Sequence, residues 1–420
     1  MRPNLLATSL TLLALAGAGA CEAQPASSEA RAETRADPVP STEVIAVAQT
    51  TEAQPTEAQP VEARAEEAQV EETQGTAQEA PAAQPDRRNR SRVIRRYMLE
   101  AEGLMPLIET DAVRQFLAEV RELPEIRTRR IYVYQSATPS AIPALEFEMA
   151  PEHIKAALKP QNIDITKYYQ TVYGSPLAYA RPLDLLAGVA EWDSFNSKKI
   201  LDFGYGQIGQ LRLLAQTGAD VTGIESSTMI SSIYTLPDDT GEIAGASGNT
   251  GSIALHQGYW PAGQFAREKV GTGYDLIMAR NVLRKGPMDL DVQVRPELRV
   301  RLRSSNEMFL ARTNEALNMG GYALVYNIGG AGPELWEQFP ASDFSCPFTT
   351  EQWEAAGFEL IANNMDDDEP MREVAKALFL DRGPNGINLE TQMYATYTIA
   401  RKVREATIPG TEPEASDELP

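Results

Sequence analysis

The stretch from Lys198 to Ser226, KKILDFGYGQIGQLRLLAQTGADVTGIES, constrains the fold more than any other part of this chain. A short apolar run ends at Leu201, three glycines follow in the spacing GxGxxG, and a helical segment then runs to Gln216. Glycines let the backbone turn sharply and approach a ligand closely, and the N–H groups that begin the next helix point toward that ligand. A strand, a glycine turn, a helix and a second strand in this order predict a nucleotide-binding unit of an α/β domain.

Two acids flank the glycine turn and bear on the ligand that it would take. The glycines are Gly204, Gly206 and Gly209; Asp202 lies two residues before the first of them, and Glu225 ends the second strand. A carboxylate at the end of that strand can accept hydrogen bonds from both hydroxyls of a ribose. Asp202 would repel a pyrophosphate and attract a cationic amino-acid group, so it disfavours a dinucleotide.

The pattern hxDxGxG, with an acid closing the next strand, resembles the class I S-adenosylmethionine-dependent methyltransferases. The resemblance implies a Rossmann-like, doubly wound, mostly parallel α/β sheet of seven strands with an antiparallel last strand. It implies S-adenosylmethionine as cofactor, with Asp202 near the methionine moiety, the three glycines under the cofactor and Glu225 on the ribose. Three alternatives stay open: a methyltransferase fold kept as a binding module without catalysis, an NAD-dependent oxidoreductase, and a turn that holds no ligand.

Later segments supply the other strands of such a sheet. The expected strands are Ser252–His256, Tyr274–Ala279, Tyr322–Tyr326, Gly357–Ile361 and Met393–Ala400. Because open α/β sheets bind ligands at the carboxyl ends of their strands, we interpret Arg280 and Asn281 as substrate-side residues. His256 is a candidate catalytic base, although a single histidine at a strand end is more often a hydrogen-bonded structural group.

Tyrosines just before the first strand define a candidate substrate lid. The segment Tyr168–Val189 has a helical pattern, and within it Tyr169 and Tyr173 are placed to line a lid, since helices in this position often cover the cofactor cleft in the methyltransferase family. An aromatic stripe packed on the sheet is the alternative. Downstream, Pro287–Arg303 alternates acids and arginines; it could recognise a carboxylate or phosphate, or form a solvated helix face.

The N-terminal residues predict export. An uncharged apolar run from Leu5 to Ala18 is too short to span a membrane as a mature helix and has the length of a signal-peptide core. Small residues end at Ala20 and Cys21 follows at once, which resembles a bacterial lipobox with Ala18 in place of the usual leucine. We expect an exported protein held at a bacterial membrane by a lipid on Cys21; a misassigned start would instead give a cytoplasmic enzyme.

Charge and composition divide the rest of the chain. The expected parts are a signal peptide (1–20), a disordered acidic tether rich in Ala, Glu, Gln and Pro (21–86), a helical extension or lid (87–190), a methyltransferase-like domain (191–405) and a disordered acidic tail (406–420). The tether has 14 acids against 3 arginines, so the net charge of -21 describes the tether more than the domain. It argues against nucleic acid as a partner.

The sequence also limits the chemistry. Two histidines in the whole chain exclude a multi-histidine metal site, and no dedicated metal is expected. The acceptor is expected to be a small molecule, but nothing in the sequence selects oxygen, nitrogen, carbon or sulfur as the accepting atom. The oligomeric state stays open.

Overall fold

The computed structural model describes residues 90–134, 140–170, 174–295, 298–384 and 386–409, and all of these residues belong to one compact unit. The expected signal peptide and tether, Cys21 and Tyr173 lie outside the described residues. So does the tail from residue 410 onward.

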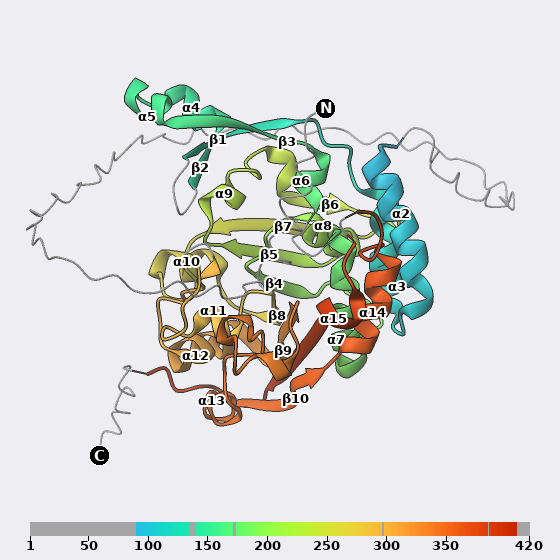
Figure 1. Cartoon of the computed structure of the whole chain (residues 1–420), viewed down its shortest axis with the longest axis vertical. Coiled ribbons are helices and arrows are strands. Elements are labelled where there is room, and N and C mark those ends of the chain that lie inside the picture. The colour runs from blue at the N-terminus through green and yellow to red at the C-terminus, as the bar shows by residue number, and fades with distance from the viewer. Residues whose placement is uncertain (1–89, 135–139, 171–173, 296–297, 385, 410–420) are drawn as a thin grey trace, which may run out of the picture. The chain divides into compact units, whose positions relative to one another are not determined.

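An eight-stranded mixed sheet lies at the centre of the domain (Figure 1). Its strand order is β10-β11-β9-β8-β4-β5-β7-β6. The strands are β4 (Lys199–Phe203), β5 (Asp220–Glu225), β6 (Gly241–Ala244), β7 (Thr250–Gln257), β8 (Tyr274–Arg280), β9 (Leu317–Gly329), β10 (Phe358–Asp366) and β11 (Tyr394–Lys402). The five strands from β7 to β9 in this order run parallel, whereas β11 runs antiparallel to both β9 and β10. This arrangement confirms the predicted doubly wound, Rossmann-like class with an antiparallel last strand.

The eighth strand is a correction to the sequence analysis. β6 pairs antiparallel with β7 at the edge of the sheet, in a segment whose glycines, serines and aspartates read as a loop. Ile243 is its one buried residue, so β6 has almost none of the apolar alternation that predicts a strand. Its pairing with β7 therefore depends on the neighbouring strand more than on its own sequence.

Helices cover both faces of the sheet. They are α7 (Ala180–Ala190), α8 (Gly209–Gln216), α9 (Thr228–Ser231), α10 (Gln264–Val270), α11 (Lys285–Met288), α12 (Asn306–Ala316), α13 (Thr350–Ala355), α14 (Asp368–Ala377) and α15 (Leu389–Gln392). Two hydrophobic cores result, and neighbouring residues of β4 enter different ones: Ile200 joins the core with α7, α8 and α14, and Leu201 joins the core with α10, α12 and α13. Successive side chains of a strand point to opposite faces, so a strand covered on both faces is apolar along its length.

The region before β4 is only partly the helical extension that the sequence predicted. Its helices are α2 (Arg92–Leu104), α3 (Asp111–Ala118), α4 (Ala144–Met149), α5 (Glu152–Ala157) and α6 (Ile165–Tyr169). A second, three-stranded antiparallel sheet of order β2-β1-β3 lies among them, with β1 at Arg129–Tyr134, β2 at Ser140–Pro143 and β3 at Leu158–Ile163. The expected helix Tyr168–Val189 is interrupted, because Gly174 has φ +105° and the short 3₁₀ helix η4 (Pro176–Tyr179) precedes α7.

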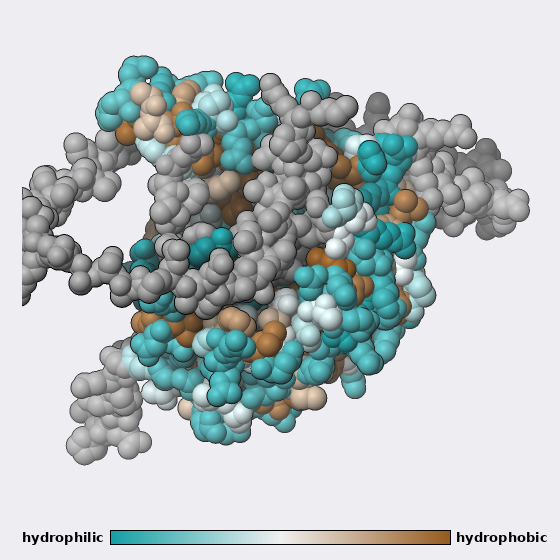
Figure 2. Space-filling view, viewed as in Figure 1, coloured by the Kyte–Doolittle hydropathy of each residue, from teal (hydrophilic) through white to brown (hydrophobic). Residues whose placement is uncertain are grey.

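Buried ion pairs fasten this region to the domain. Arg129 of β1 contacts the carboxylate of Asp239 at 2.6 Å, and the Tyr168 hydroxyl donates to the same carboxylate at 2.6 Å. Arg181 of α7 pairs with Asp367 at 2.5 Å. The surface over α2, α3 and α14 is largely hydrophilic (Figure 2). Among the described residues, no helix combines the length and the apolar character needed to cross a membrane.

Candidate cofactor and acceptor site

The predicted strand, glycine turn, helix and strand are all present in the structure. β4 ends at Phe203, the turn occupies residues 204–208, α8 begins at Gly209 and β5 ends at Glu225. β4 pairs with β5 on one side and β8 on the other, so the strand order reverses between β4 and β8. Ligands of doubly wound sheets bind at the carboxyl ends of the strands beside such a reversal. The glycine turn lies at that point.

The three glycines have different roles. Gly204 has φ +76°, and a Cβ there would lie 2.5 Å from Val282 Cγ2. Gly206 has φ +61°, and a Cβ there would have no atom within 4 Å, so this glycine borders open space that a ligand can approach. A Cβ on Gly209 would lie 2.3 Å from Pro176 Cγ. The missing side chain of Gly209 therefore allows η4 to pack against the start of α8.

Asp202 is a fully buried acid beneath this turn. Its Oδ2 accepts a hydrogen bond from Gln210 Nε2 at 3.0 Å; its Oδ1 is buried and accepts no hydrogen bond of good geometry, although the Tyr179 hydroxyl lies near this carboxyl. Burial raises the pKa of Asp202 to about 7, and the Gln210 hydrogen bond and the nearby Arg280 charge oppose part of that rise. A buried carboxyl oxygen without a donor is a site that a cationic or hydrogen-bonding ligand group can satisfy.

Glu225 lies beside the glycine turn, where the ribose of a nucleoside would be expected. Its Oε1 accepts from the Ser227 N–H at 2.9 Å, and its Oε2 accepts from the Gly206 N–H at 3.4 Å. Burial raises the pKa of this carboxyl, and these backbone hydrogen bonds oppose the rise. These two hydrogen bonds therefore hold the carboxylate in place. One of them comes from Gly206, the glycine that borders open space.

Both residues predicted to lie on the substrate side are at the end of β8: Arg280 is its last residue and Asn281 follows it. Arg280 is 6% exposed, and its guanidinium carbon lies 5.0 Å from the centre of the Tyr179 ring. Asn281 has φ +60°; its N–H donates to Tyr326 O at 3.0 Å, and its Oδ1 accepts from the Ile328 N–H at 2.6 Å. Both hydrogen bonds join the end of β8 to β9, so Asn281 has a structural role whether or not it contacts a substrate.

His256 lies apart from these two residues. It is a half-buried residue of β7, and burial followed by the charge of Lys269 lowers its pKa, which favours the neutral imidazole. β5 and β4 separate β7 from β8, so the backbone of His256 lies three strand spacings, roughly 14 Å, from Arg280. The structure therefore brings Asp202, Glu225 and Arg280 to adjacent strands and leaves His256 at a distance.

The lid prediction for Tyr169 is wrong. Its side chain is fully buried, its hydroxyl donates to Pro124 O at 2.9 Å, and its ring would lie 3.2 Å from a Cβ on Gly209. Tyr97 and Tyr168 make edge-on ring contacts with it. Tyr169 thus belongs to an aromatic cluster that supports α8, which was the alternative interpretation of the tyrosine stripe.

The sequence analysis missed two residues of this site. Gln210 donates both to Asp202 and to Tyr205 O, at 3.0 and 2.8 Å, and so orients the acid and closes the glycine turn. Its place directly after Gly209, in the first turn of α8, was a usable signal. Val282 packs on Gly204, which no local pattern could indicate. No group of three or more His, Cys, Asp or Glu in the described part of the chain is arranged to hold a metal ion.

No protein-family model matches this chain, and no curated protein sequence is similar to it. Solved structures do match its fold. One is described as a candidate sarcosine dimethylglycine methyltransferase from Galdieria sulphuraria; it is 12% identical over 53% of this chain and 85% of its own, with a TM-score of 0.33. A TehB-like S-adenosylmethionine-dependent methyltransferase from Corynebacterium glutamicum is 17% identical over 53% of this chain and 86% of its own, with a TM-score of 0.27.

A third similar structure is phosphoethanolamine N-methyltransferase 2 from Haemonchus contortus, bound to phosphomonomethylethanolamine and S-adenosylhomocysteine. It is 12% identical over 59% of this chain and 63% of its own, with a TM-score of 0.31. Because these identities and TM-scores are low, the fold class rests on the strand order of this chain itself. Fold and glycine turn together define a doubly wound α/β domain whose glycine turn lies where the strand order reverses.

Proposed function

We propose that this chain is an S-adenosylmethionine-dependent methyltransferase that acts on a small-molecule acceptor. The observation that carries the proposal is the unused Oδ1 of Asp202, a buried carboxyl oxygen beneath the glycine turn. A cationic amino-acid group would supply the donor that this oxygen lacks. The strand order, the open side of Gly206 and the position of Glu225 support the same ligand.

The residues present fit this cofactor. Asp202 would hold its ammonium group, Glu225 its ribose hydroxyls, and Gly206 would let the backbone approach it. When bound, the cofactor supplies an electrophilic methyl group on a sulfonium. The protein's own contribution is to hold the acceptor in line with that methyl group and to exclude water. Arg280, buried at the end of β8, would lie on the acceptor side.

Two alternative functions, an NAD-dependent oxidoreductase and a binding module without catalysis, make predictions that differ from those of a methyltransferase. An NAD-dependent oxidoreductase would place a pyrophosphate beside the turn, where the buried carboxyl of Asp202 repels it. A binding module that has lost catalysis would bind the same nucleoside and transfer no methyl group. Affinity measurements separate the first alternative from our proposal, and turnover with candidate acceptors separates the second.

Replacing Glu225 tests the cofactor assignment. We expect Glu225→Ala to weaken the binding of S-adenosylhomocysteine by roughly 1.5–3 kcal/mol, the value of a charge-assisted hydrogen bond, which is about 10- to 150-fold in dissociation constant. Isothermal titration of the full chain measures this change. Glu373→Gln is the matched control, because Glu373 is a half-exposed residue of α14 that pairs with Lys376. Equal affinity in wild type and Glu225→Ala would remove the ribose assignment.

We also propose that the protein is exported and held at a membrane by a lipid on Cys21, which the apolar run and the small residues before this cysteine support. The alternative is a cytoplasmic enzyme, since S-adenosylmethionine is made in the cytoplasm. Labelling with radioactive palmitate distinguishes the two. We expect label in the wild type and none in Cys21→Ser, and an unlabelled wild type found in the cytoplasmic fraction would contradict the proposal.

A further inference from the structure

The segment Asn281–Ser304, which follows β8, borders the proposed site directly. Val282 packs against Gly204 of the glycine turn. The carbonyl of Leu283 accepts from Asn327 Nδ2 at 2.7 Å, which joins the segment to β9. Since β8 is the strand next to β4, the first residues of this segment lie on the acceptor side of the glycine turn.

Two nitrogen atoms near the start of this segment are buried donors without acceptors. Asn281 Nδ2 and Arg284 Nε are inaccessible to solvent and make no hydrogen bond. The amide orientation of Asn281 is determined, because its oxygen accepts from the Ile328 N–H at 2.6 Å and the nitrogen must point the other way. Other side chains among the described residues, such as Arg212 and Arg312, also have a buried Nε without an acceptor, but the two donors here follow β8 directly, and a buried donor without a partner is costly.

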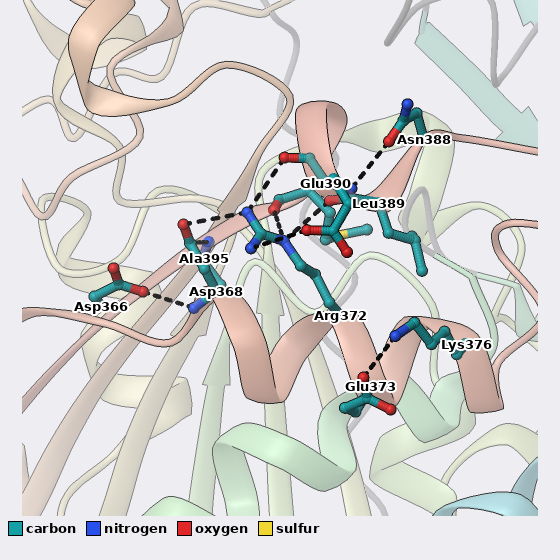
Figure 3. Close-up of polar contacts among 10 residues, drawn as sticks. Asp366, Asp368, Arg372, Glu373, Lys376, Asn388, Leu389, Glu390 and Ala395 are labelled. Carbon is teal, nitrogen blue, oxygen red and sulfur yellow. Dashed lines mark hydrogen bonds and ion pairs between the residues drawn. The ribbon is translucent and has the colours of Figure 1, made fainter.

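Another arginine of the chain shows what a satisfied guanidinium looks like. Arg372 of α14 donates from Nε to Leu389 O at 3.1 Å and to Met393 O at 3.2 Å, and it pairs with Asp368 at 3.6 Å (Figure 3). These contacts tie α14 to α15, so Arg372 is structural. Arg284 has no comparable set of acceptors for its Nε.

The charge of the segment is opposite to that of the chain. Residues 281–304 hold six Lys and Arg against three acids, in a protein whose net charge is -21. Their described part after α11 runs as an irregular loop, so the solvated helix face considered for Pro287–Arg303 is wrong. Arg299 donates to the carbonyl oxygens of Asp289 and Val292, which fixes the loop in shape. Lys285 pairs with Asp343 at 3.5 Å, and the Arg303 guanidinium lies 3.5 Å from the centre of the Tyr259 ring, so part of the positive charge of the segment is already paired or stacked.

We propose that Asn281 Nδ2 and Arg284 bind an oxyanion group of the methyl acceptor, so that the acceptor is an anionic small molecule carrying a carboxylate or a phosphate. This inference rests on the proposed function and names its substrate class. The buried donors give the oxyanion hydrogen bonds, and the surplus of cations in the loop attracts it. A methyl acceptor bound in this way places its oxyanion group against the loop after β8 and its nucleophilic atom toward the glycine turn.

The test uses sodium phosphate and sodium acetate as probes, titrated by calorimetry into the full chain with S-adenosylhomocysteine present. We expect at least one probe to bind, and Arg284→Gln and Asn281→Asp each to weaken that binding by roughly tenfold or more. Asn281→Asp keeps the acceptor for Ile328, removes the Nδ2 donor and adds a negative charge that repels an anion. Arg95→Gln, at an exposed position of α2, is the matched control and should bind as the wild type does.

The outcomes separate the sources of the oxyanion and the two proposals. Binding of phosphate alone indicates a phosphorylated acceptor, and binding of acetate alone indicates a carboxylate. Absence of both, or equal binding in wild type and Asn281→Asp, overturns the inference. If Arg284→Gln fails to fold by circular dichroism, Asn281→Asp decides. A separate titration with S-adenosylhomocysteine alone tests the proposed function. If S-adenosylhomocysteine does not bind, the phosphate and acetate titrations are repeated without it and still test the oxyanion site.

Discussion

Replacing Asp202 with asparagine should change how the stability of the protein depends on pH. The native pKa of about 7 lies roughly three units above the ordinary value of 3.8, and each unit corresponds to about 1.36 kcal/mol. The native state thus holds the Asp202 proton more tightly than the unfolded state does, so the free energy of unfolding falls as the pH rises between these two values. The full cost, about 4 kcal/mol, is present above pH 7 and absent below about pH 4.

Urea unfolding of the wild type and Asp202→Asn at several pH values measures this cost. Between about pH 5 and about pH 8 the wild type should lose about 3 kcal/mol more unfolding free energy than the variant. Asparagine keeps an acceptor for Gln210 and cannot ionise, and all other groups titrate in both proteins, so the difference isolates Asp202. A difference that stays constant over this range would show that Asp202 does not ionise in a buried site, and would refute the reasoning.

Three further predictions concern the glycine turn and the attachment of the N-terminal region. Gly204→Ala should destabilise the fold more than Gly206→Ala. Both positions have a left-handed backbone, in which an alanine costs about 1–2 kcal/mol, but only a Cβ at position 204 would also collide with Val282. Gly206→Ala should instead reduce S-adenosylhomocysteine affinity at least roughly tenfold by calorimetry, and wild-type affinity would contradict the open face of Gly206. Asp239→Asn should cost about 3–5 kcal/mol in urea unfolding by leaving the mostly buried Arg129 charge without its ionised partner, and a loss below about 1 kcal/mol would contradict this.

The parts of the fold that the sequence predicted are those that local patterns determine. The apolar run of β4, the glycines and the acid of β5 lie within 29 residues, and each has a spacing that few structures other than a strand, a turn and a helix can satisfy. The antiparallel last strand was predicted because the resemblance supplied it. Asp202 and Glu225 followed from the same segment, and the structure places both beside the turn.

What the sequence could not predict depends on contacts between distant residues. β6 is a strand only because β7 pairs with it, and Tyr169 is buried only because Gly209 and Tyr97 lie against it. A tyrosine that packs under a helix and one that lines a lid have the same spacing in the sequence. The direction of Asn281 Nδ2 likewise depends on a distant residue, because the N–H of Ile328 donates to the amide oxygen of Asn281.

The contact between α2 and α14 has a consequence for how this protein reaches its native state. Arg96 of α2 donates to Leu378 O at 3.3 Å, across 282 residues of sequence, and Gly103 faces Ala377 at the distance of ordinary van der Waals contact. On the ribosome α2 is made early, and its ring contact with Tyr169 can form long before its contacts with α14, which must wait until α14 has been made. Folding should therefore be slow, since such late, long-range contacts delay the transition state, and the incomplete chain exposes the apolar face of α2 to chaperones in the meantime.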